Sequence, residues 1–416
     1  MNYGLIGANV KDSLSKLIHE SYSKINYELV SLKSERDVLN CLNSNFKGLN
    51  VTIPYKNFVY AHCDYLSDLA KRTQCVNTVI KKDGKTYGYN TDIFGFEKLI
   101  QKNNIEIKGK NCLVLGTGST SRTVTLVLNE LGAKSIKYLS RNPVIKDAYS
   151  YSDIDNYKNS QIIINTTPVG MNSDEESLLD FSIFKEPGYF IDVIYNKAHT
   201  KTAINALENG FKTFNGLYML IAQAQKAQEL FFETNIEERI IDKAYLKLFF
   251  KCFNLAFIGH PLSGKSYVAK SLSPLLAVPC IDIDEEIEKR ENKKISEIFT
   301  NNGEDYFRSI ESSLIKEVSN QKGNLISLGG GAVLNKENMQ NILKYSLIVS
   351  LKRDIKTIND NEFVNRPLCN CREQLMALIT NRQDLYKKYS DIEIVNDGSF
   401  ESIFKKIGEI LWNFLL

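Results

Sequence analysis

A phosphate-binding loop lies deep within the chain and restricts how the residues around it can fold. Residues 259–266 read Gly-His-Pro-Leu-Ser-Gly-Lys-Ser, which matches the pattern G-x-x-x-x-G-K-S. An apolar run at 255–258 precedes the loop, and a stretch with helical spacing at 267–276 follows it. The strand, loop and helix that this pattern requires are therefore all present, which disfavours the alternative of a glycine-rich turn without function.

The backbone of such a loop determines its chemistry. Its N–H groups bind phosphate oxygens, the lysine adds a positive charge, and the last serine can bind Mg²⁺ through its hydroxyl. The sequence thus predicts a nucleotide site, with Ser266 also a metal ligand. The predicted phosphate-binding residues are Gly259, Ser263, Gly264, Lys265 and Ser266.

A second nucleotide-binding pattern lies well upstream. Residues 112–115 form an apolar run that leads into Gly116-Thr-Gly118, a turn typical of dinucleotide-binding folds but weak evidence alone. The next predicted strand, 135–139, is followed by Arg141, where an enzyme that uses NAD usually carries an acidic residue. A guanidinium there suits a 2′-phosphate and favours NADP, and the alternative is an ordinary surface arginine.

The length of 416 residues exceeds what one hydrophobic core normally serves, so we expect two or three domains. The composition, 43% hydrophobic and 24% charged, is that of a globular protein, and a net charge of +3 is too small to favour nucleic-acid or membrane binding. We find no signal peptide and expect a cytoplasmic protein. Short apolar segments alternate with helical stretches, which predicts an α/β fold with largely parallel sheets. The predicted strands are 3–7, 29–32, 48–53, 112–115, 135–139, 162–165 and 190–193.

Three polar segments precede the dinucleotide pattern. They are residues 50–56, 75–79 and 88–95, and each places polar groups at the end of a predicted strand or in a loop, where functional sites are commonly built. Lys56 and Asp92, if brought together, could exchange a proton with a hydroxyl while hydride moves to a carbonyl. From spacing alone, a surface salt bridge is an equally good interpretation.

These segments resemble the signature blocks of shikimate dehydrogenases, in the family's order, across residues 1 to about 245. Further matching blocks are Tyr3–Gly7, Ser13-Leu-Ser15, Asn165–Met171, Asp192–Tyr195 and Gly216–Ala224. The resemblance implies that Lys56 and Asp92 are the catalytic pair. It implies substrate binding by Ser13, Ser15, Thr52, Asn77, Tyr195 and Gln223, and NADP(H) binding by Gly116, Gly118, Ser119, Arg141, Asn165, Thr166 and Gly216. Lys16 and Ser119 depart from the family's pattern, where a proline and a glycine are usual.

Residues 253 to about 412 resemble shikimate kinases. The matching elements are Asp282-Ile-Asp284, Phe307-Arg308-x-x-Glu311 and Leu328-Gly-Gly-Gly331. Phosphoryl transfer needs a divalent ion, neutralisation of phosphate charge and a carboxylate near the reacting hydroxyl, and this order supplies a candidate for each. The alternative for the two aspartates is a solvated acidic start of a helix.

The kinase resemblance implies a role for each element. Asp284 would be the catalytic base, Lys265 would act on the transferring phosphate, and Asp282 would support Mg²⁺ through water. Arg366 would close over ATP, although the stretch before it, 354–364, is shorter than usual. The implied shikimate-binding residues are Arg308, Gly329, Gly330, Gly331 and Arg382.

We therefore expect an α/β protein with a substrate domain at 1–100, completed by 217–245, a Rossmann-type NADP-binding domain at 101–216 and a P-loop kinase domain with a parallel sheet at 253–416. The expected function is reduction of 3-dehydroshikimate with NADPH, followed by phosphorylation of shikimate with ATP and Mg²⁺. The alternatives are a quinate or shikimate dehydrogenase that uses NAD fused to a related kinase, and a chain in which one half is a non-catalytic binding module. The expected partners are small molecules, with a homo-oligomer left open.

Overall fold

The computed structural model describes residues 2–143, 145–172, 176–363 and 369–411. Its internal contacts divide the chain into two compact units. The first unit comprises residues 1–169, 181–195 and 214–245, and the second comprises 170–180, 196–213 and 246–416. Within the described ranges, we find no helix with both the length and the apolar character that a membrane span requires.

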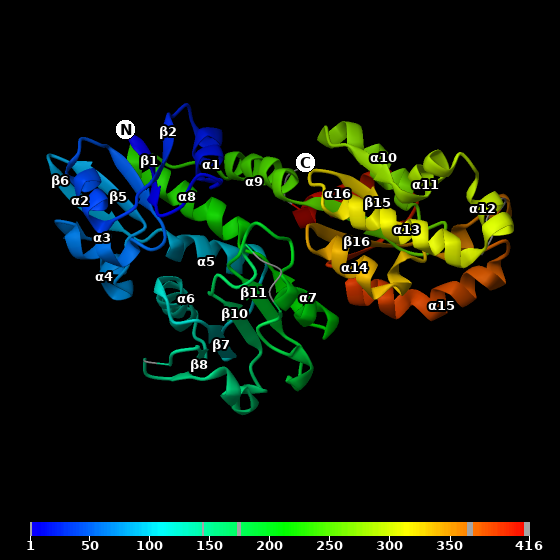
Figure 1. Ribbon diagram of the computed structural model, residues 1–416, viewed down its shortest axis with the longest axis horizontal. Helices are drawn as coiled ribbons and strands as arrows, with labels where there is room; N and C mark the ends of the chain where they lie inside the picture. Colours follow the sequence, from blue (N-terminus) through cyan, green and yellow to red (C-terminus); the bar gives the residue numbers. More distant parts are fainter. Residues whose placement is uncertain (1, 144, 173–175, 364–368, 412–416) are drawn as a thin grey trace. The chain divides into compact units, whose positions relative to one another are not determined.

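The first sheet of the first unit mixes parallel and antiparallel strands in the order β2-β1-β3-β5-β6-β4 (Figure 1). Strand β1 pairs in parallel with β2 and β3, whereas β5 runs antiparallel to β3 and β6. The strands are β1 (Tyr3–Gly7), β2 (Tyr27–Ser31), β3 (Gly48–Val51), β4 (Tyr65–Leu66), β5 (Thr78–Lys82) and β6 (Lys85–Tyr89). The helices of this part are α1 (Ser15–Tyr22), α2 (Glu35–Asn43), α3 (Lys56–His62) and α4 (Asp68–Thr73).

The second sheet has the order β12-β11-β10-β7-β8-β9, and the pairings from β11 through β9 are parallel. Its strands are β7 (Asn111–Leu115), β8 (Ser135–Leu139), β9 (Ala148–Tyr149), β10 (Ile162–Asn165), β11 (Tyr189–Asp192) and β12 (Lys212–Phe214). Helix α6 (Ser119–Glu130) follows β7. Helices α5 (Asp92–Lys102) and α8 (Leu217–Phe232) pack against each other, and apolar residues of α5, α6, α8 and this sheet form one core.

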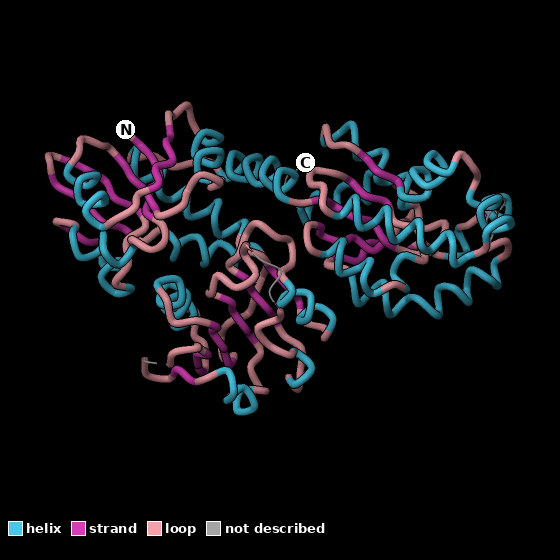
Figure 2. Tube along the Cα trace, viewed as in Figure 1, coloured by secondary structure: helices cyan, strands magenta, loops and turns pink. Residues whose placement is uncertain are grey.

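The second unit contains one parallel sheet in the order β14-β15-β13-β16-β17, with helices packed around it (Figure 2). Its strands are β13 (Asn254–Ile258), β14 (Cys280–Asp282), β15 (Leu325–Ser327), β16 (Ser346–Lys352) and β17 (Ile392–Val395). Its helices are α7 (Lys201–Glu208), α10 (Lys265–Leu276), α11 (Ile283–Glu291), α12 (Ile295–Asn302), α13 (Glu304–Ser319), α14 (Lys336–Leu343), α15 (Arg372–Tyr389) and α16 (Phe400–Leu411), and α9 (Glu238–Cys252) leads into it.

Helix α7 belongs to the second unit through its packing. Ile204 and Leu207 are buried in the same apolar core as Ile258 of β13. The residues before the helix are also fixed, because His199 Nδ1 lies 2.9 Å from the Leu343 carbonyl oxygen and Nε2 lies 2.8 Å from Asp391 Oδ1. A carbonyl and a carboxylate both accept hydrogen bonds, so both ring nitrogens donate and the imidazole is positively charged. Burial by itself would lower the pKa of His199, but the Asp391 charge and the hydrogen bonds to the ring together outweigh burial and the pKa is raised.

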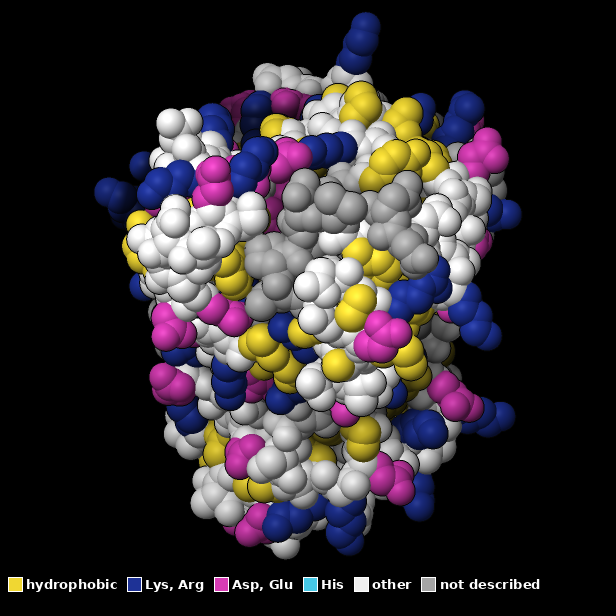
Figure 3. All heavy atoms as spheres, turned by 90° about the vertical axis from the view of Figure 1, so that its right-hand side faces the viewer, with side chains coloured by type: hydrophobic (Ala, Val, Ile, Leu, Met, Phe, Trp, Pro, Cys, Tyr) yellow, Lys and Arg dark blue, Asp and Glu magenta, His cyan; other side chains and the backbone are white. Residues whose placement is uncertain are grey.

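The α/β class and the parallel sheets that the sequence predicts are confirmed, and each predicted strand coincides with an observed one to within two residues at either end. The antiparallel hairpin of β5 and β6 is the main element that the predicted strands did not include. On the face of the molecule drawn in Figure 3, basic and acidic side chains are interspersed rather than gathered by sign, in keeping with the small net charge.

Candidate active sites

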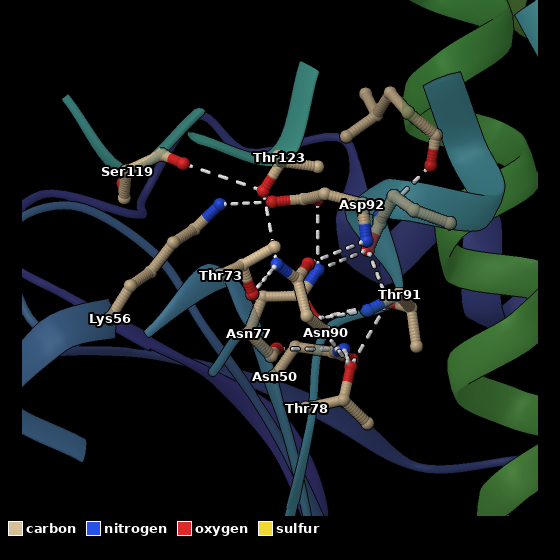
Figure 4. Close-up of polar contacts among 12 residues, drawn as sticks. Asn50, Lys56, Thr73, Asn77, Thr78, Asn90, Thr91, Asp92, Ser119 and Thr123 are labelled. Atoms are coloured by element: carbon tan, nitrogen blue, oxygen red, sulfur yellow. Dashed lines mark hydrogen bonds and ion pairs between the residues drawn. The ribbon is translucent and has the colours of Figure 1, made fainter. Parts of the chain in front are cut away.

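The first site is built around an ion pair between two helix starts (Figure 4). Lys56 begins α3 and Asp92 begins α5, and Lys56 Nζ lies 2.5 Å from Asp92 Oδ2. The side chains are 13% and 10% exposed, so the pair is largely shielded from solvent. Burial alone would lower the pKa of the Lys56 ammonium, but the Asp92 charge and the hydrogen bond outweigh burial and the pKa is raised.

Buried asparagine amides hold Asp92 in place. Asn77 Nδ2 donates to Asp92 Oδ1 at 2.8 Å, and the Asp92 backbone N–H donates to Asn90 Oδ1 at 3.1 Å. Asn77 Oδ1 in turn accepts from the Thr91 N–H at 2.7 Å. Asn77 Nδ2 also lies 3.4 Å from Gln223 Oε1 on α8. The structure therefore brings four of the predicted residues, Lys56, Asp92, Asn77 and Gln223, into one connected network.

The other predicted substrate-binding residues of the first unit lie on separate elements. Ser13 Oγ donates to Ser15 Oγ at 3.0 Å where α1 begins. Thr52 follows β3, and a Cβ on Gly7 would lie only 2.4 Å from its methyl group, so the glycine allows these two segments to meet. Tyr195 is half-buried beyond the end of β11. No hydrogen bond among the described residues joins these side chains directly to the Lys56 and Asp92 pair.

The dinucleotide turn has the geometry of an anion site. Gly116 directly follows strand β7 with a φ of +99°, which glycine tolerates far better than other residues, and Gly118 is the N-cap of α6. The N–H groups at the start of this helix are therefore available to phosphate oxygens. Arg141 is exposed beyond the end of β8, and Gly216 lies so close to the Val193 carbonyl that a Cβ would be 2.1 Å from its oxygen.

Two residues predicted to lie along the cofactor make internal hydrogen bonds instead of projecting freely. Asn165 is fully buried, donates to Asp192 Oδ1 at 3.1 Å and accepts from the Thr167 N–H at 2.9 Å. Thr166 Oγ1 donates to the Leu115 carbonyl at 2.6 Å. These side chains fix the carboxyl ends of β10, β11 and β7, so they shape the predicted cofactor site through the backbone.

The phosphate loop of the second unit lies between β13 and α10, as predicted. Lys265 is buried, and its ammonium donates to the carbonyl oxygens of Gly259 and His260, both 3.0 Å away. Ser266 Oγ lies 3.3 Å from Ser327 Oγ at the end of β15. Because β14, β15 and β13 are adjacent and parallel, Asp282 at the end of β14 reaches the same edge of the sheet.

The residues at this edge fit a magnesium ion. Asp282 Oδ1 caps α11 by accepting from the Glu285 N–H, whereas its Oδ2 is buried with no hydrogen-bond partner in the described part of the chain. Such an oxygen is costly to bury unless an ion or an ordered water satisfies it. Mg²⁺ typically takes one or two protein oxygens and keeps several waters, which matches a serine hydroxyl beside one carboxylate.

A pocket beside the phosphate loop gathers the remaining predicted kinase residues. Arg308 Nη1 donates to Glu311 Oε2 at 2.7 Å, and Arg382 Nη1 donates to the Gly330 carbonyl at 3.1 Å. Burial raises the pKa of Glu311, although the Arg308 charge opposes that shift. The lining includes Pro261, Asp284, Arg308, Glu311, Gly329, Gly330, Gly331 and Arg382.

Two of the three glycines of this pocket leave no room for a side chain without movement of a neighbour. A Cβ on Gly329 would lie 2.5 Å from Glu311 Oε1, and one on Gly331 would lie 2.4 Å from Arg308 Nη2. Glycine backbone thus lines the pocket together with two arginines and several carboxylates, a lining suited to a small molecule with both a carboxylate and hydroxyls. Arg366, predicted to close over ATP, lies outside the described residues.

Some supporting residues were not among the predicted sites. Asn90 and Thr91 hold Asp92 and Asn77, and Glu311 holds Arg308. The signal for them was present, since all three belong to the matching blocks. Tyr386, whose hydroxyl donates to the Gly330 carbonyl, lies outside those blocks and only the fold reveals its contact.

Comparison with known protein families agrees with this division of sites. Residues 5–79 match the family model described as the shikimate dehydrogenase substrate binding domain, and residues 261–412 match the shikimate kinase model. A shikimate dehydrogenase (NADP(+)) of Clostridium perfringens (strain 13 / Type A) is 36% identical over 270 residues, which cover 60% of this chain and 98% of that protein.

Solved structures give the same result for the first part of the chain. Shikimate dehydrogenase 1 of Peptoclostridium difficile is 32% identical, with a TM-score of 0.55 over 60% of this chain and 98% of that one. A shikimate 5-dehydrogenase of Thermus thermophilus, solved in complex with NADP(H) and shikimate, is 28% identical, with a TM-score of 0.53 over 59% and 98% of the two chains. The chain therefore belongs to the shikimate dehydrogenase family and carries a shikimate kinase domain at residues 261–412.

Proposed function

We propose that this chain is a bifunctional enzyme that reduces 3-dehydroshikimate to shikimate with NADPH and then phosphorylates the 3-hydroxyl of shikimate with ATP. The observation that supports the proposal is the presence of two sites, each with its own candidate reacting groups. One has the Lys56 and Asp92 pair beside a dinucleotide turn, and the other has Asp284 in a pocket beside a phosphate loop. The functional domains are then 1–100 with 217–245, 101–216, and 253–416.

In the first reaction the protein controls the proton at the reacting oxygen. The raised pKa of Lys56 keeps the ammonium protonated at neutral pH, so Lys56 can donate a proton to the oxygen that becomes a hydroxyl. Asp92 orients this donor, and Asn77 holds Asp92 from the other carboxylate oxygen. Serine, threonine and amide groups of Ser13, Ser15, Thr52, Asn77 and Gln223 would bind the remaining hydroxyls and the carboxylate of the substrate.

The first unit fits NADP(H) at the turn after β7. The start of α6 would receive the pyrophosphate, and Arg141 beyond β8 would pair with the 2′-phosphate. When bound, the cofactor supplies the hydride. The internal hydrogen bonds of Asn165 and Thr166 keep the adjoining strand ends rigid, which preserves the alignment that such a transfer needs.

In the second reaction the protein positions a hydroxyl and neutralises phosphate charge. Lys265 and the loop N–H groups would bind the phosphates of ATP, and Ser266 with Asp282 would hold Mg²⁺, which neutralises phosphate charge. Asp284 would accept the proton of the reacting hydroxyl. Arg308 and Arg382 would bind the carboxylate of shikimate and so fix which hydroxyl faces the phosphate loop.

An omission series tests the proposal. Purified full chain is supplied with 3-dehydroshikimate, NADPH, ATP and Mg²⁺, and products are identified by mass spectrometry. We expect shikimate 3-phosphate from the full mixture, shikimate alone without ATP, and no product without NADPH unless shikimate is added. Accumulation of shikimate in the complete mixture would disprove the kinase half.

The proposal also places both reactions in the cytoplasm, where NADPH and ATP are supplied and the eight cysteines stay reduced.

A further inference from the structure

The middle glycine of the kinase pocket is anchored by helix α15. The carbonyl oxygen of Gly330 accepts a hydrogen bond from the Tyr386 hydroxyl at 2.6 Å and a second from Arg382 Nη1 at 3.1 Å. The two donors are one helical turn apart, so they lie on the same face of α15. One carbonyl therefore joins a pocket-lining arginine and a tyrosine that is not part of the pocket lining.

Helix α15 holds this glycine turn at Gly330, whereas the carbonyls of the two neighbouring glycines bond within the turn. Glycine has the widest backbone freedom, and side chains at positions 329 and 331 would collide with Glu311 and Arg308. The Gly329 and Gly331 carbonyls already accept the N–H groups of Ala332 and Leu334, at 3.1 and 3.0 Å. The Gly330 carbonyl is thus the acceptor through which α15 holds the turn.

Tyr386 is suited to this role by its surroundings. Its side chain is 4% exposed and packs in the main core of the second unit. Burial raises the pKa of the phenol to about 12, so the hydroxyl stays protonated and remains a donor at any physiological pH. The ring is fixed by packing, which leaves the hydroxyl little freedom to point elsewhere.

We infer that Tyr386 is a positioning residue for the shikimate site of the kinase, which holds Gly330 and Arg382 in the arrangement that receives the substrate. This inference rests on the proposed function. Without the hydroxyl, Arg382 would be the one side-chain donor left to the Gly330 carbonyl among the described residues, so the turn and the guanidinium would both gain freedom. The substrate would then have to order them on binding, which weakens its affinity. The phosphate loop has separate anchors, since Asn396 Nδ2 donates to the Ser263 carbonyl at 2.8 Å.

The test compares two substitutions of tyrosine by phenylalanine in the same helix. Tyr386→Phe removes the anchoring hydroxyl and keeps the ring. Tyr389→Phe makes the same chemical change at a residue that is equally buried, 3% exposed, but has no hydrogen bond to the glycine turn among the described residues. Steady-state kinetics of phosphorylation in the full chain would give KM for shikimate and for ATP separately. Calorimetric titration without ATP, fitted with two shikimate sites because the dehydrogenase site also binds shikimate, would give the Kd of the kinase site without turnover.

For Tyr386→Phe we expect KM and Kd for shikimate to rise about 5- to 20-fold, as typical for the loss of a buried hydrogen bond. KM for ATP should stay within about twofold, and the dehydrogenase rate should not change. A purely structural role would lower the amount of active kinase without moving KM. Tyr389→Phe should match the parent.

Three results would overturn the inference: an unchanged shikimate KM in Tyr386→Phe, an equal rise in KM for ATP, or the same loss in Tyr389→Phe. The parent enzyme separates this inference from the proposed function. If the parent does not phosphorylate shikimate, the proposed function is wrong and the inference falls with it. If the parent does so and Tyr386→Phe behaves like the parent, only the inference is wrong.

Discussion

The carboxylate of Asp92 is held at both oxygens, by Lys56 at Oδ2 and by Asn77 at Oδ1. Because each oxygen has its own donor, the carboxylate cannot rotate without losing a hydrogen bond, and the ammonium of Lys56 keeps one direction. A rigid donor that is held in its protonated form suits a reduction, in which the protein gives a proton to the product oxygen. The sequence placed these two residues in separate segments, and their pairing depends on tertiary structure.

A prediction at the residue scale concerns Arg141. The side chain is exposed beyond β8, at the position where a 2′-phosphate would lie in a dinucleotide fold. Arg141→Ala should raise KM for NADPH about tenfold or more, because hydrogen bonds to charged groups are strong, and should leave KM for NADH within about twofold. Initial rates with both cofactors measure this, and equal losses for NADPH and NADH would show that Arg141 has a structural role.

At the scale of elements, the hairpin of β5 and β6 assembles the first site. Its turn is Asp83-Gly84, with φ of +51° and +74°, and this dipeptide between two strands is a strong hairpin signal. The register pairs Thr78 with Tyr89, so Asn77 before β5 lies beside the residues that follow β6. The sequence contained the turn signal, but its rhythm of alternating strands and helices favoured parallel pairing. The antiparallel contact that brings Asn77 to Asp92 was therefore missed.

The phosphate loop contains a residue with an unfavourable backbone conformation. Leu262 has a φ of +66°, a left-handed conformation that costs a residue with a side chain about 1–2 kcal/mol. Its side chain is only 9% exposed and packs in a small core with Ile358, Phe363, Cys369 and Leu375. Burial of the leucine offsets the backbone strain, so this side chain holds the loop in its shape.

This arrangement predicts an unusual order of stability for two variants of Leu262. Both Leu262→Ala and Leu262→Gly lose the buried side chain, but only alanine keeps the left-handed strain. We expect the glycine variant to be more stable than the alanine variant by about 1 kcal/mol, the reverse of the order in ordinary helices and strands. Chemical denaturation of the kinase transition would measure the difference. An alanine variant as stable as the glycine variant would contradict the left-handed conformation.

At the scale of the whole molecule, the sequence identified two sets of reacting groups, but it did not show which segments pack into which compact unit. Helix α7 lies between strands β11 and β12 of the dinucleotide sheet in the chain, yet it buries Ile204 and Leu207 in the core of the second unit. Periodicity shows that a helix has an apolar face, but not which core that face enters. Local patterns therefore predicted the strands and the motifs, whereas the packing of α7 required the structure.

The last prediction follows from the presence of the two sites in different units. Lys56→Ala should lower the rate of 3-dehydroshikimate reduction about 10²–10⁴-fold, the usual contribution of a general acid, and leave phosphorylation of added shikimate at the parent rate. Lys265→Ala should have the opposite effect, because its ammonium acts only at the phosphate loop. Both activities are measured on each variant, so each site is the folding control for the other. Loss of both activities in a variant that remains folded would contradict the expectation that the two sites act independently.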